Sequence, residues 1–501
     1  MASVKSLAKD TAVYGLSSII GRFLNWLLVP LYTNMFISTE YGVVTYVYTI
    51  VAVALIILTY GMETGFFRFA NHERYNNPME VYSTAMTSIA VSSTAFLVLV
   101  ILFLTPVSYA MECADHPEYT LLMAVTVAVD AFTSLPFSYL RYKRRPYRFA
   151  ALKLIGIALN IGFNLFFILL CPWIWEQAPG IIEWFYDPAF GIGYIFLANF
   201  ISSVVVFLLL IPDFTHFKWK WNGRLWREML AYSFPLLILG IAGIMNQTLG
   251  QILLPWILPD KADAMAQLGI YGANYKIAIV MVMFIQAFRF AYEPFIFSQN
   301  KNAGADCNRS FCDAMKYFVI FAMVIFLGVM FYLDFLRYFI SPAYFSGLKV
   351  VPVLMLAEFF FGVFFNLSLW YKLTDKTIWG TWFSLIGFGV TLLLNIILVP
   401  RLGYMGCAWA ALACYGTMMV LSYFIGKVKH PIGYDIKSIL IYFFTALALY
   451  GVAVVATTSS QWINISFRTL LLVLFVIFVL RREHLTIRQL IPVSKHNTRQ
   501  I

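Results

Sequence analysis

The feature that most constrains the fold of this chain is a regular succession of long apolar segments. We count fourteen of them, each near the roughly 20 residues that an α-helix needs to cross the hydrocarbon core of a bilayer. Helices and closed barrels are the structures that satisfy their backbone hydrogen bonds inside lipid. The succession therefore predicts an all-α polytopic membrane protein. The predicted segments lie near 11–36, 41–67, 80–104, 119–140, 149–171, 189–211, 229–256, 267–292, 315–334, 348–371, 377–399, 403–426, 436–457 and 465–480.

Composition excludes the main alternatives to a membrane protein. Hydrophobic residues make up 61% of the chain and charged residues 12%, against roughly 25% charged residues in soluble domains. This balance argues against a disordered chain, a secreted disulfide scaffold and a water-soluble multidomain enzyme. The six cysteines are scattered, and none forms a pair at metal-ligand spacing. We therefore expect no metal site and no cofactor.

The distribution of basic residues predicts the orientation of the segments. If the segments alternate from the N-terminus, 28 of the 35 lysines and arginines fall on the side of the two termini and 5 on the other side. Cytoplasmic loops carry such an excess of positive charge, so we expect both termini to be cytoplasmic. Topology and attraction to anionic lipid also account for the net charge of +11 without a nucleic-acid partner.

Several short motifs occur twice in the chain, and the second copy lies six predicted segments after the first. A shift by an even number of segments keeps the same orientation in the membrane, so the two halves form a parallel repeat, which is a known transporter plan. We predict an N-terminal lobe of six helices at 1–221, a C-terminal lobe of six helices at 222–430, and two extra helices with a basic tail at 431–501. The motifs are Tyr142-Lys143, Leu154-Ile155-Gly156, Asn164 and Phe67-Arg68-Phe69-Ala70, which recur as Tyr371-Lys372, Leu385-Ile386-Gly387, Asn395 and Phe288-Arg289-Phe290-Ala291.

Polar residues inside the segments mark a candidate central cavity. A charge near the middle of the bilayer costs roughly 2.5–3.5 kcal/mol, so such residues usually face protein or water. Arg22 lies eleven residues into the first segment, and helical spacing places it on one face with its polar neighbours. The seventh segment carries a second polar face. The predicted cavity residues are Ser18, Arg22, Asn25, Asn246, Gln247, Gln251 and Lys276.

These residues also have structural interpretations. Arg22 and Lys276 can reach the membrane surface or hold the bundle together, and the amides can join helices to one another. Three acidic residues, Glu63, Asp130 and Glu358, lie within segments. Each can neutralise a buried cation or carry a coupling proton, and we favour a structural ion pair for each.

Several short stretches together point to a known family. They are Tyr14-Gly15, Gly21-Arg22, Pro30-Leu31-Tyr32, Glu40-Tyr41-Gly42, Tyr60-Gly61-Met62-Glu63-Thr64, Phe67-Arg68-Phe69 and Pro400-Arg401-Leu402-Gly403-Tyr404-Met405-Gly406-Cys407-Ala408. With them the chain resembles the polysaccharide biosynthesis proteins, the oligosaccharide flippases of the multidrug/oligosaccharidyl-lipid/polysaccharide superfamily. The resemblance implies a V-shaped bundle of two six-helix lobes that moves undecaprenyl-pyrophosphate-linked sugars from the cytoplasmic to the outer leaflet. It also implies that Arg22, helped by Lys276, attracts the pyrophosphate, while Asn and Gln side chains bind sugar.

The leading hypothesis is a bacterial inner-membrane flippase that works by alternating access for surface polysaccharide of the O-antigen type. It needs no catalytic residue. Its partners would be lipid-linked oligosaccharide, membrane lipid and, as candidates, glycan-assembly enzymes. The alternatives are an ion-coupled antiporter for drugs or small solutes, a membrane polymerase or ligase, and a non-transporting scaffold. The short outward loops argue against the enzyme.

Overall fold

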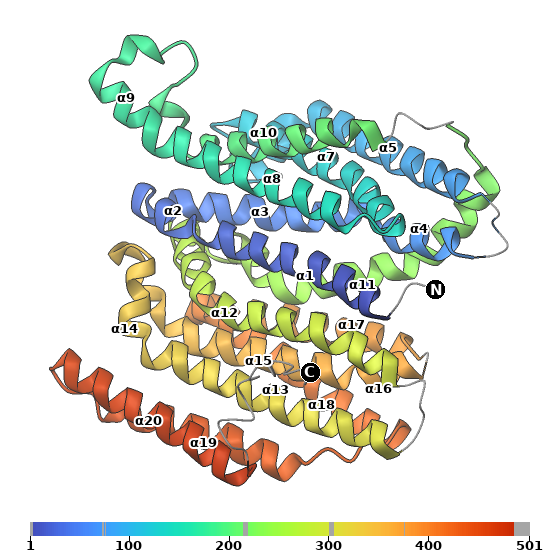
Figure 1. Cartoon of the computed structure of the whole chain (residues 1–501). Coiled ribbons are helices and arrows are strands. Elements are labelled where there is room, and N and C mark those ends of the chain that lie inside the picture. The colour runs from blue at the N-terminus through green and yellow to red at the C-terminus, as the bar shows by residue number, and fades with distance from the viewer. Residues whose placement is uncertain are drawn as a thin grey trace, which may run out of the picture.

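The computed structural model describes residues 4–72, 75, 77–213, 219–299, 305–374 and 376–484, and these residues form a helical bundle (Figure 1). The N-terminal helices are α1 (Val4–Trp26), α2 (Val29–Met35), α3 (Ser38–Thr59), α4 (Met62–Ala70), α5 (Pro78–Leu102), α6 (Leu104–Ala110), α7 (Pro117–Tyr142), α8 (Pro146–Leu165), α9 (Cys171–Gln177) and α10 (Gly193–Leu210). The C-terminal helices are α11 (Gly223–Ile257), α12 (Lys261–Gln299), α13 (Ala305–Phe331), α14 (Leu333–Leu336), α15 (Val351–Leu367), α16 (Leu369–Leu373), α17 (Ile378–Leu402), α18 (Tyr404–Lys429), α19 (Ile436–Val455) and α20 (Gln461–Arg482).

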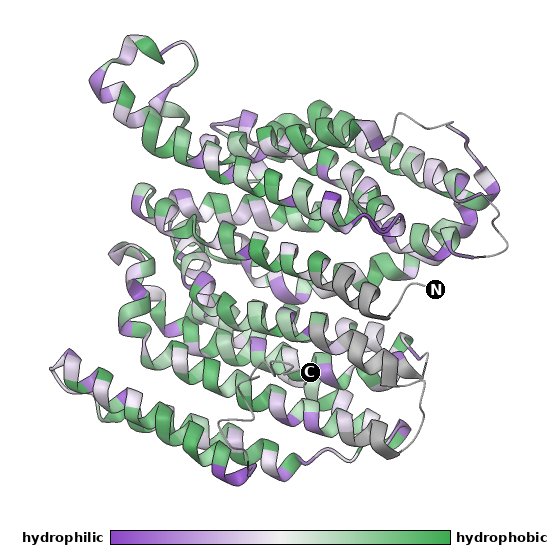
Figure 2. Ribbon diagram, in the orientation of Figure 1, coloured by the Kyte–Doolittle hydropathy of each residue, from purple (hydrophilic) through white to green (hydrophobic). Residues whose placement is uncertain are grey.

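Within the described residues, thirteen helical stretches are long and apolar enough to cross a membrane. They coincide with predicted segments two to fourteen, and α1 with α2 covers the first. Hydrophobic residues run along the lengths of the helices, and hydrophilic residues are frequent at the ends and connections (Figure 2). The prediction of an all-α, multi-pass membrane protein is confirmed.

The helical chain is interrupted at two places near the N-terminus, between α1 and α2 and between α3 and α4. Helix α1 ends before Leu27, and α2 resumes with Pro30 in its first turn, where proline is tolerated because its missing N–H has no helical partner. Helix α3 stops at Tyr60 and Gly61, whose φ angles are +30° and +73°. Glycine adopts this left-handed region without strain. The turn changes the direction of the chain before α4, which carries Glu63.

The bundle consists of two groups of helices that lie side by side (Figure 1). In the first, α8 packs on α1 and α10, and α7 packs on α5 and α10. In the second, α18 packs on α15 and α17, and α12 packs on α15. Helix α11 belongs to the second group and joins it to the first, since it contacts α3, α4 and α5 of the first group as well as α17 and α18 of its own. The lobe boundaries at 221 and 430 remain predictions.

Helices α3 and α12, which the sequence repeat relates, cross almost backbone to backbone. A Cβ atom on Gly42 would lie 1.9 Å from the carbonyl oxygen of Met265, and one on Gly269 would lie 2.0 Å from that of Ser38. A Cβ on Gly272 would lie 2.7 Å from the Thr45 hydroxyl. Such approaches are open only to glycine, as in other close crossings of membrane helices.

The same end of the bundle carries further contacts between the two groups. Tyr344 donates a hydrogen bond to the Phe36 carbonyl at 2.8 Å, and Trp256 donates one to Tyr46 at 2.9 Å. The ammonium of Lys261 lies 2.5 Å from the Glu112 carboxylate. We call this the closed end. The other end, which holds the basic α7–α8 turn at 143–145, is called the basic end.

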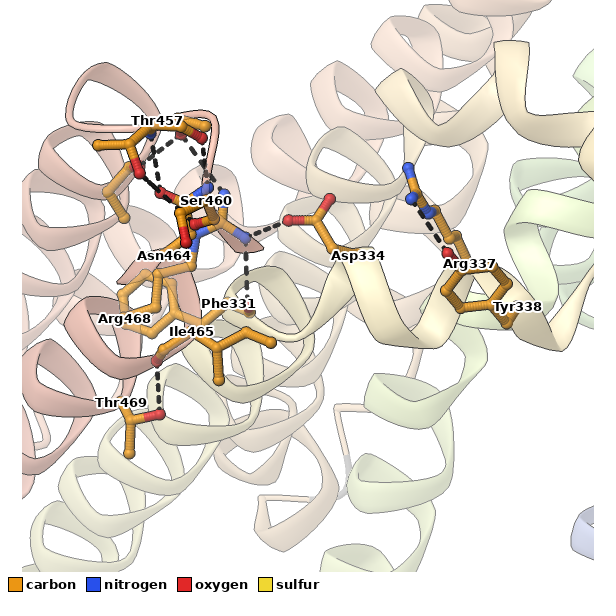
Figure 3. A network of polar contacts seen from close by, with 12 residues as sticks. Phe331, Asp334, Arg337, Tyr338, Thr457, Ser460, Asn464, Ile465, Arg468 and Thr469 are labelled. Atoms are coloured by element: carbon orange, nitrogen blue, oxygen red, sulfur yellow. Dashed lines mark hydrogen bonds and ion pairs between the residues drawn. The ribbon is translucent and has the colours of Figure 1, made fainter. Parts of the chain in front are cut away.

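Polar contacts attach α19 and α20 to the rest of the bundle at both ends. At the closed end, Arg468 lies 2.5 Å from the Asp334 carboxylate and also contacts the Phe331 carbonyl (Figure 3). At the basic end, the Glu483 carboxylate accepts from Lys316 at 2.6 Å and from Tyr442 at 2.5 Å. Burial would raise the pKa of Glu483, but these two hydrogen bonds outweigh it and lower the pKa below its usual value.

We expect Gly269→Ala to destabilise the protein, because the new methyl group would enter the space of the Ser38 backbone. Overpacking of this kind costs about 1–3 kcal/mol, which unfolding of the purified protein in detergent measures. Gly328→Ala is the matched control, since a Cβ there meets nothing within 4 Å. Equal stability of the two variants would contradict the close crossing.

A double-mutant cycle tests the attachment of α20. Arg468→Gln and Asp334→Asn are each expected to lower stability, with a coupling of about 0.5–1 kcal/mol between them. Arg337→Gln is the control, because its contact in Figure 3 is a 3.4 Å hydrogen bond to the adjacent Tyr338. Additive effects of the two substitutions would mean that the pair does not hold α20.

Candidate functional site

Arg22 lies on α1, the helix that packs against α8 of the first group and α12 of the second. Its side chain is exposed in the absence of lipid. The electrostatic neighbours that act on it are Tyr275 and Arg289, both on α12. Neither is a carboxylate. The guanidinium of Arg289 itself lies over the Phe365 ring, 4.4 Å from the ring centroid.

A ladder of amide side chains begins one turn beyond Arg22. Asn160 donates to Asn25 at 3.5 Å, Asn164 donates to Asn160 at 3.2 Å, and Tyr32 donates to Asn164 at 2.9 Å. The ladder joins α1 and α2 to α8. It extends the polar face of the first predicted segment past the break between the two helices.

A polar cavity of about 620 Å³ lies inside the first group of helices. Side chains from α1, α3, α4, α7, α8 and α10 line it. Three predicted residues, Asn25, Glu63 and Asp130, are among them, so the tertiary structure gathers residues that are more than 100 positions apart. Serine, threonine and asparagine side chains make up much of the remaining wall.

Each acidic group in this cavity has a basic group as its partner. The Glu63 carboxylate lies 3.1 Å from Arg141 and accepts a hydrogen bond from Ser138 at 3.1 Å. Asp130 interacts electrostatically with Lys153 and accepts a hydrogen bond from Ser203. Both acids therefore have cationic partners on α7 or α8, and neither partner is Arg22 or Lys276.

Lys153 also lines this cavity, and it is not among the cavity residues predicted from the sequence. The side chain reaches back over the Phe137 ring, 4.0 Å from its centroid. The sequence does indicate this position, because Lys153 lies inside the predicted segment 149–171. It shares helical spacing with Gly156, Asn160 and Asn164, which form one face of a helix.

The second group of helices contains a different polar chain. Gln247 on α11 donates to the Tyr275 hydroxyl at 3.0 Å, and that hydroxyl donates to Glu358 on α15 at 3.0 Å. Glu358 is buried, with 4% of its surface exposed. A tyrosine, rather than a cation, is thus the hydrogen-bond partner of this acid.

The remaining predicted residues lie in several places. Asn246 is buried and donates to the Ser384 carbonyl of α17 at 3.1 Å. Gln251 accepts from Thr49 of α3 at 2.8 Å, across the two groups. The backbone carbonyl of Lys276 accepts from Trp26 at 2.7 Å, while its side chain is half-buried. The side chain of Ser18 lies outside the described residues.

Tyr275→Phe tests the buried chain around Glu358. The substitution removes the donor to a buried carboxyl group and the acceptor for Gln247, which is expected to cost about 1–3 kcal/mol of unfolding free energy. Tyr271→Phe, one turn earlier on the same helix and also buried, is the control with a smaller expected effect. Equal losses would show that the hydroxyl of Tyr275 has no special structural role.

Comparisons with known proteins place the chain in a family. The model of the polysaccharide biosynthesis protein family matches residues 7–299. No curated protein sequence matches the chain significantly. Among solved structures, "Lipid II flippase MurJ, inward closed conformation" aligns with a TM-score of 0.71 and 15% identity over 95% of this chain and 99% of that chain.

Two solved structures titled as a multidrug resistance MATE family transporter of the MOP superfamily have the same fold. The inward-facing structure aligns with a TM-score of 0.64 and 10% identity over 84% of this chain and 98% of that chain. The outward-facing structure aligns with a TM-score of 0.51 and 12% identity over 86% and 98%. The chain therefore belongs to the polysaccharide biosynthesis protein family, and it folds like the MurJ and MATE transporters.

Proposed function

We propose that this protein is a flippase that moves undecaprenyl-pyrophosphate-linked oligosaccharide from the cytoplasmic to the outer leaflet of a bacterial inner membrane. The product would serve surface polysaccharide biosynthesis. Family membership supports a role in polysaccharide biosynthesis, and the fold is one used by transport proteins. Both termini would face the cytoplasm, at the basic end.

The observation that carries this proposal is the position of Arg22, an exposed arginine on α1, the helix that packs against both groups. A charge on a membrane-spanning helix loses solvation. A multiply charged anion bound to Arg22 would offset this loss, because arginine binds phosphate oxygens with paired, charge-assisted hydrogen bonds. The pyrophosphate of a lipid-linked sugar is such an anion.

The two groups of helices touch at both ends of the bundle. At the basic end, α11 packs on α4, and Gly15 of α1 lies against the Phe290 ring of α12. The contacts at the closed end include the closest backbone approach. The α3–α12 crossing and the contacts of Tyr344, Trp256 and Lys261 join the two groups of helices there. In alternating access, two repeats rock about a site near the middle of the membrane. Outward opening would therefore have to separate this crossing while new contacts form at the basic end.

Translocation by this route breaks no covalent bond. The residues required are those that hold an anion, bind sugar hydroxyls and change the contacts between the groups. Enzymes that build and consume lipid-linked glycans are the candidate partners, because one class must supply the cargo and another must remove it. The prenyl chain would stay in the membrane lipid during the transfer.

The central experiment measures leaflet exchange by purified protein in liposomes. The cargo is the lipid-linked oligosaccharide that accumulates in cells depleted of the protein, scored by lectin access from outside. We expect Arg22→Gln to lower the rate at least tenfold and Arg22→Lys to retain part of it, because lysine keeps the charge but not the bidentate geometry. Normal rates in Arg22→Gln would contradict the role of this residue.

The same liposomes test the antiporter alternative. Uptake of a soluble organic cation under an imposed proton or sodium gradient, with no exchange of the lipid, would replace the flippase proposal. The matched control is Ile155→Phe on α8, at a side chain that is 42% exposed and does not line the cavity. It is expected to behave like the unaltered protein in both assays.

A further inference from the structure

The cavity inside the first group of helices has the chemistry of a site for a ligand rich in hydroxyl groups. Its volume of about 620 Å³ lies within the range of roughly 300–1,000 Å³ that is usual for small-molecule sites. Its lining contains both hydrogen-bond donors and hydrogen-bond acceptors. They include the hydroxyls of Thr59, Ser134 and Ser203 and the amides of Asn160 and Asn199.

The charges in the wall favour an uncharged ligand. Glu63 pairs with Arg141, and Asp130 is coupled to Lys153, so the wall has no net charge from these four residues. Both hydrogen bonds to Glu63 use Oε2, which leaves Oε1 with acceptor capacity. A saccharide presents many hydroxyl donors and acceptors and suits such a wall better than an ion of either sign.

The position of the cavity relative to Arg22 supplies the second argument. Asn25 lines the cavity and follows Arg22 by three residues, which is about 4.5 Å along a helix and keeps both on one face. In a lipid-linked oligosaccharide, the first sugar is bonded directly to the pyrophosphate. A pyrophosphate held at Arg22 would therefore present its first sugar to Asn25 and to the mouth of this cavity.

We propose that this cavity is a saccharide subsite that receives the first sugars of the cargo, in addition to the anion site at Arg22. The proposal rests on the flippase function proposed above and names the part of the cargo that the first group of helices recognises. The asparagine ladder from Asn25 to Asn164 would extend the polar surface toward the closed end. The contribution of the sugars to the binding affinity can then be measured separately from the contribution of the pyrophosphate.

The test compares two probes on the full chain in nanodiscs. One is undecaprenyl pyrophosphate without sugar, and the other is the sugar-bearing lipid purified from depleted cells. Asn199→Leu removes a cavity amide while keeping the number of side-chain heavy atoms, and it also removes a 3.4 Å hydrogen bond to the Tyr48 hydroxyl. Ser134→Phe fills the space. Ser134 bonds only the carbonyl of Ala131 on its own helix among the described contacts, so its loss leaves both charge pairs in place.

We expect the unaltered protein to bind the sugar-bearing lipid at least tenfold more tightly than the bare lipid. Both cavity variants are expected to bring this ratio close to one without weakening the bare lipid. Arg22→Gln is expected to weaken both probes alike and keep the ratio. Ile155→Phe, at an exposed side chain of α8 outside the cavity lining, is the control for added bulk, and Asn199→Leu keeps the test valid if Ser134→Phe does not fold.

The outcomes separate the two proposals. An unchanged ratio in folded cavity variants, or a ratio of one in the unaltered protein, would overturn the saccharide subsite while leaving the flippase function intact. Failure of the unaltered protein to bind either lipid would overturn both. Loss of binding to the bare lipid in Asn199→Leu would also overturn the subsite, because the cavity would then act on the pyrophosphate.

Discussion

The rest of the structure depends on the near contact of two backbones, where α3 crosses α12. Gly42, Gly269 and Gly272 allow this approach, because a side chain at any of them would push the helices apart. In lipid there is little hydrophobic force between helices, so packing of small residues and interhelical hydrogen bonds must hold a crossing together. The crossing joins the two groups backbone to backbone at one end, whereas contacts of α4 with α11 and of α1 with α12 join them at the other.

The charged residues singled out in the sequence lie in three different environments of the bundle. Glu63 and Asp130 have cationic partners within the first group of helices. Glu358 is held by a tyrosine within the second. Arg22 instead faces α12 across the junction, where its neighbours are a tyrosine and another arginine. Charges satisfied within one group can travel with it as a rigid unit, whereas a charge at the junction responds to the position of both groups.

This division gives a physical account of how a lipid with a polar headgroup could be handled. The junction supplies positive charge for phosphate, and the neighbouring cavity supplies neutral hydrogen-bonding capacity for sugar. One turn of α1 connects the two through Arg22 and Asn25. The prenyl chain requires nothing from either site, because the bilayer already solvates it. A shift of one group of helices relative to the other would alter the spacing at the junction and leave the cavity intact.

The sequence by itself determined the number and order of the spanning helices, because apolar runs of this length have one stable form in lipid. It also identified Arg22, Glu63, Asp130 and Glu358 as polar residues that need partners, since burial of an unpaired charge is costly. Only the tertiary structure decided which partners they have. Lys153 lines the cavity, Asn246 is buried against α17, and Tyr275 donates a hydrogen bond to Glu358. Pairing across helices depends on their relative rotation and depth, which periodicity along one helix does not encode.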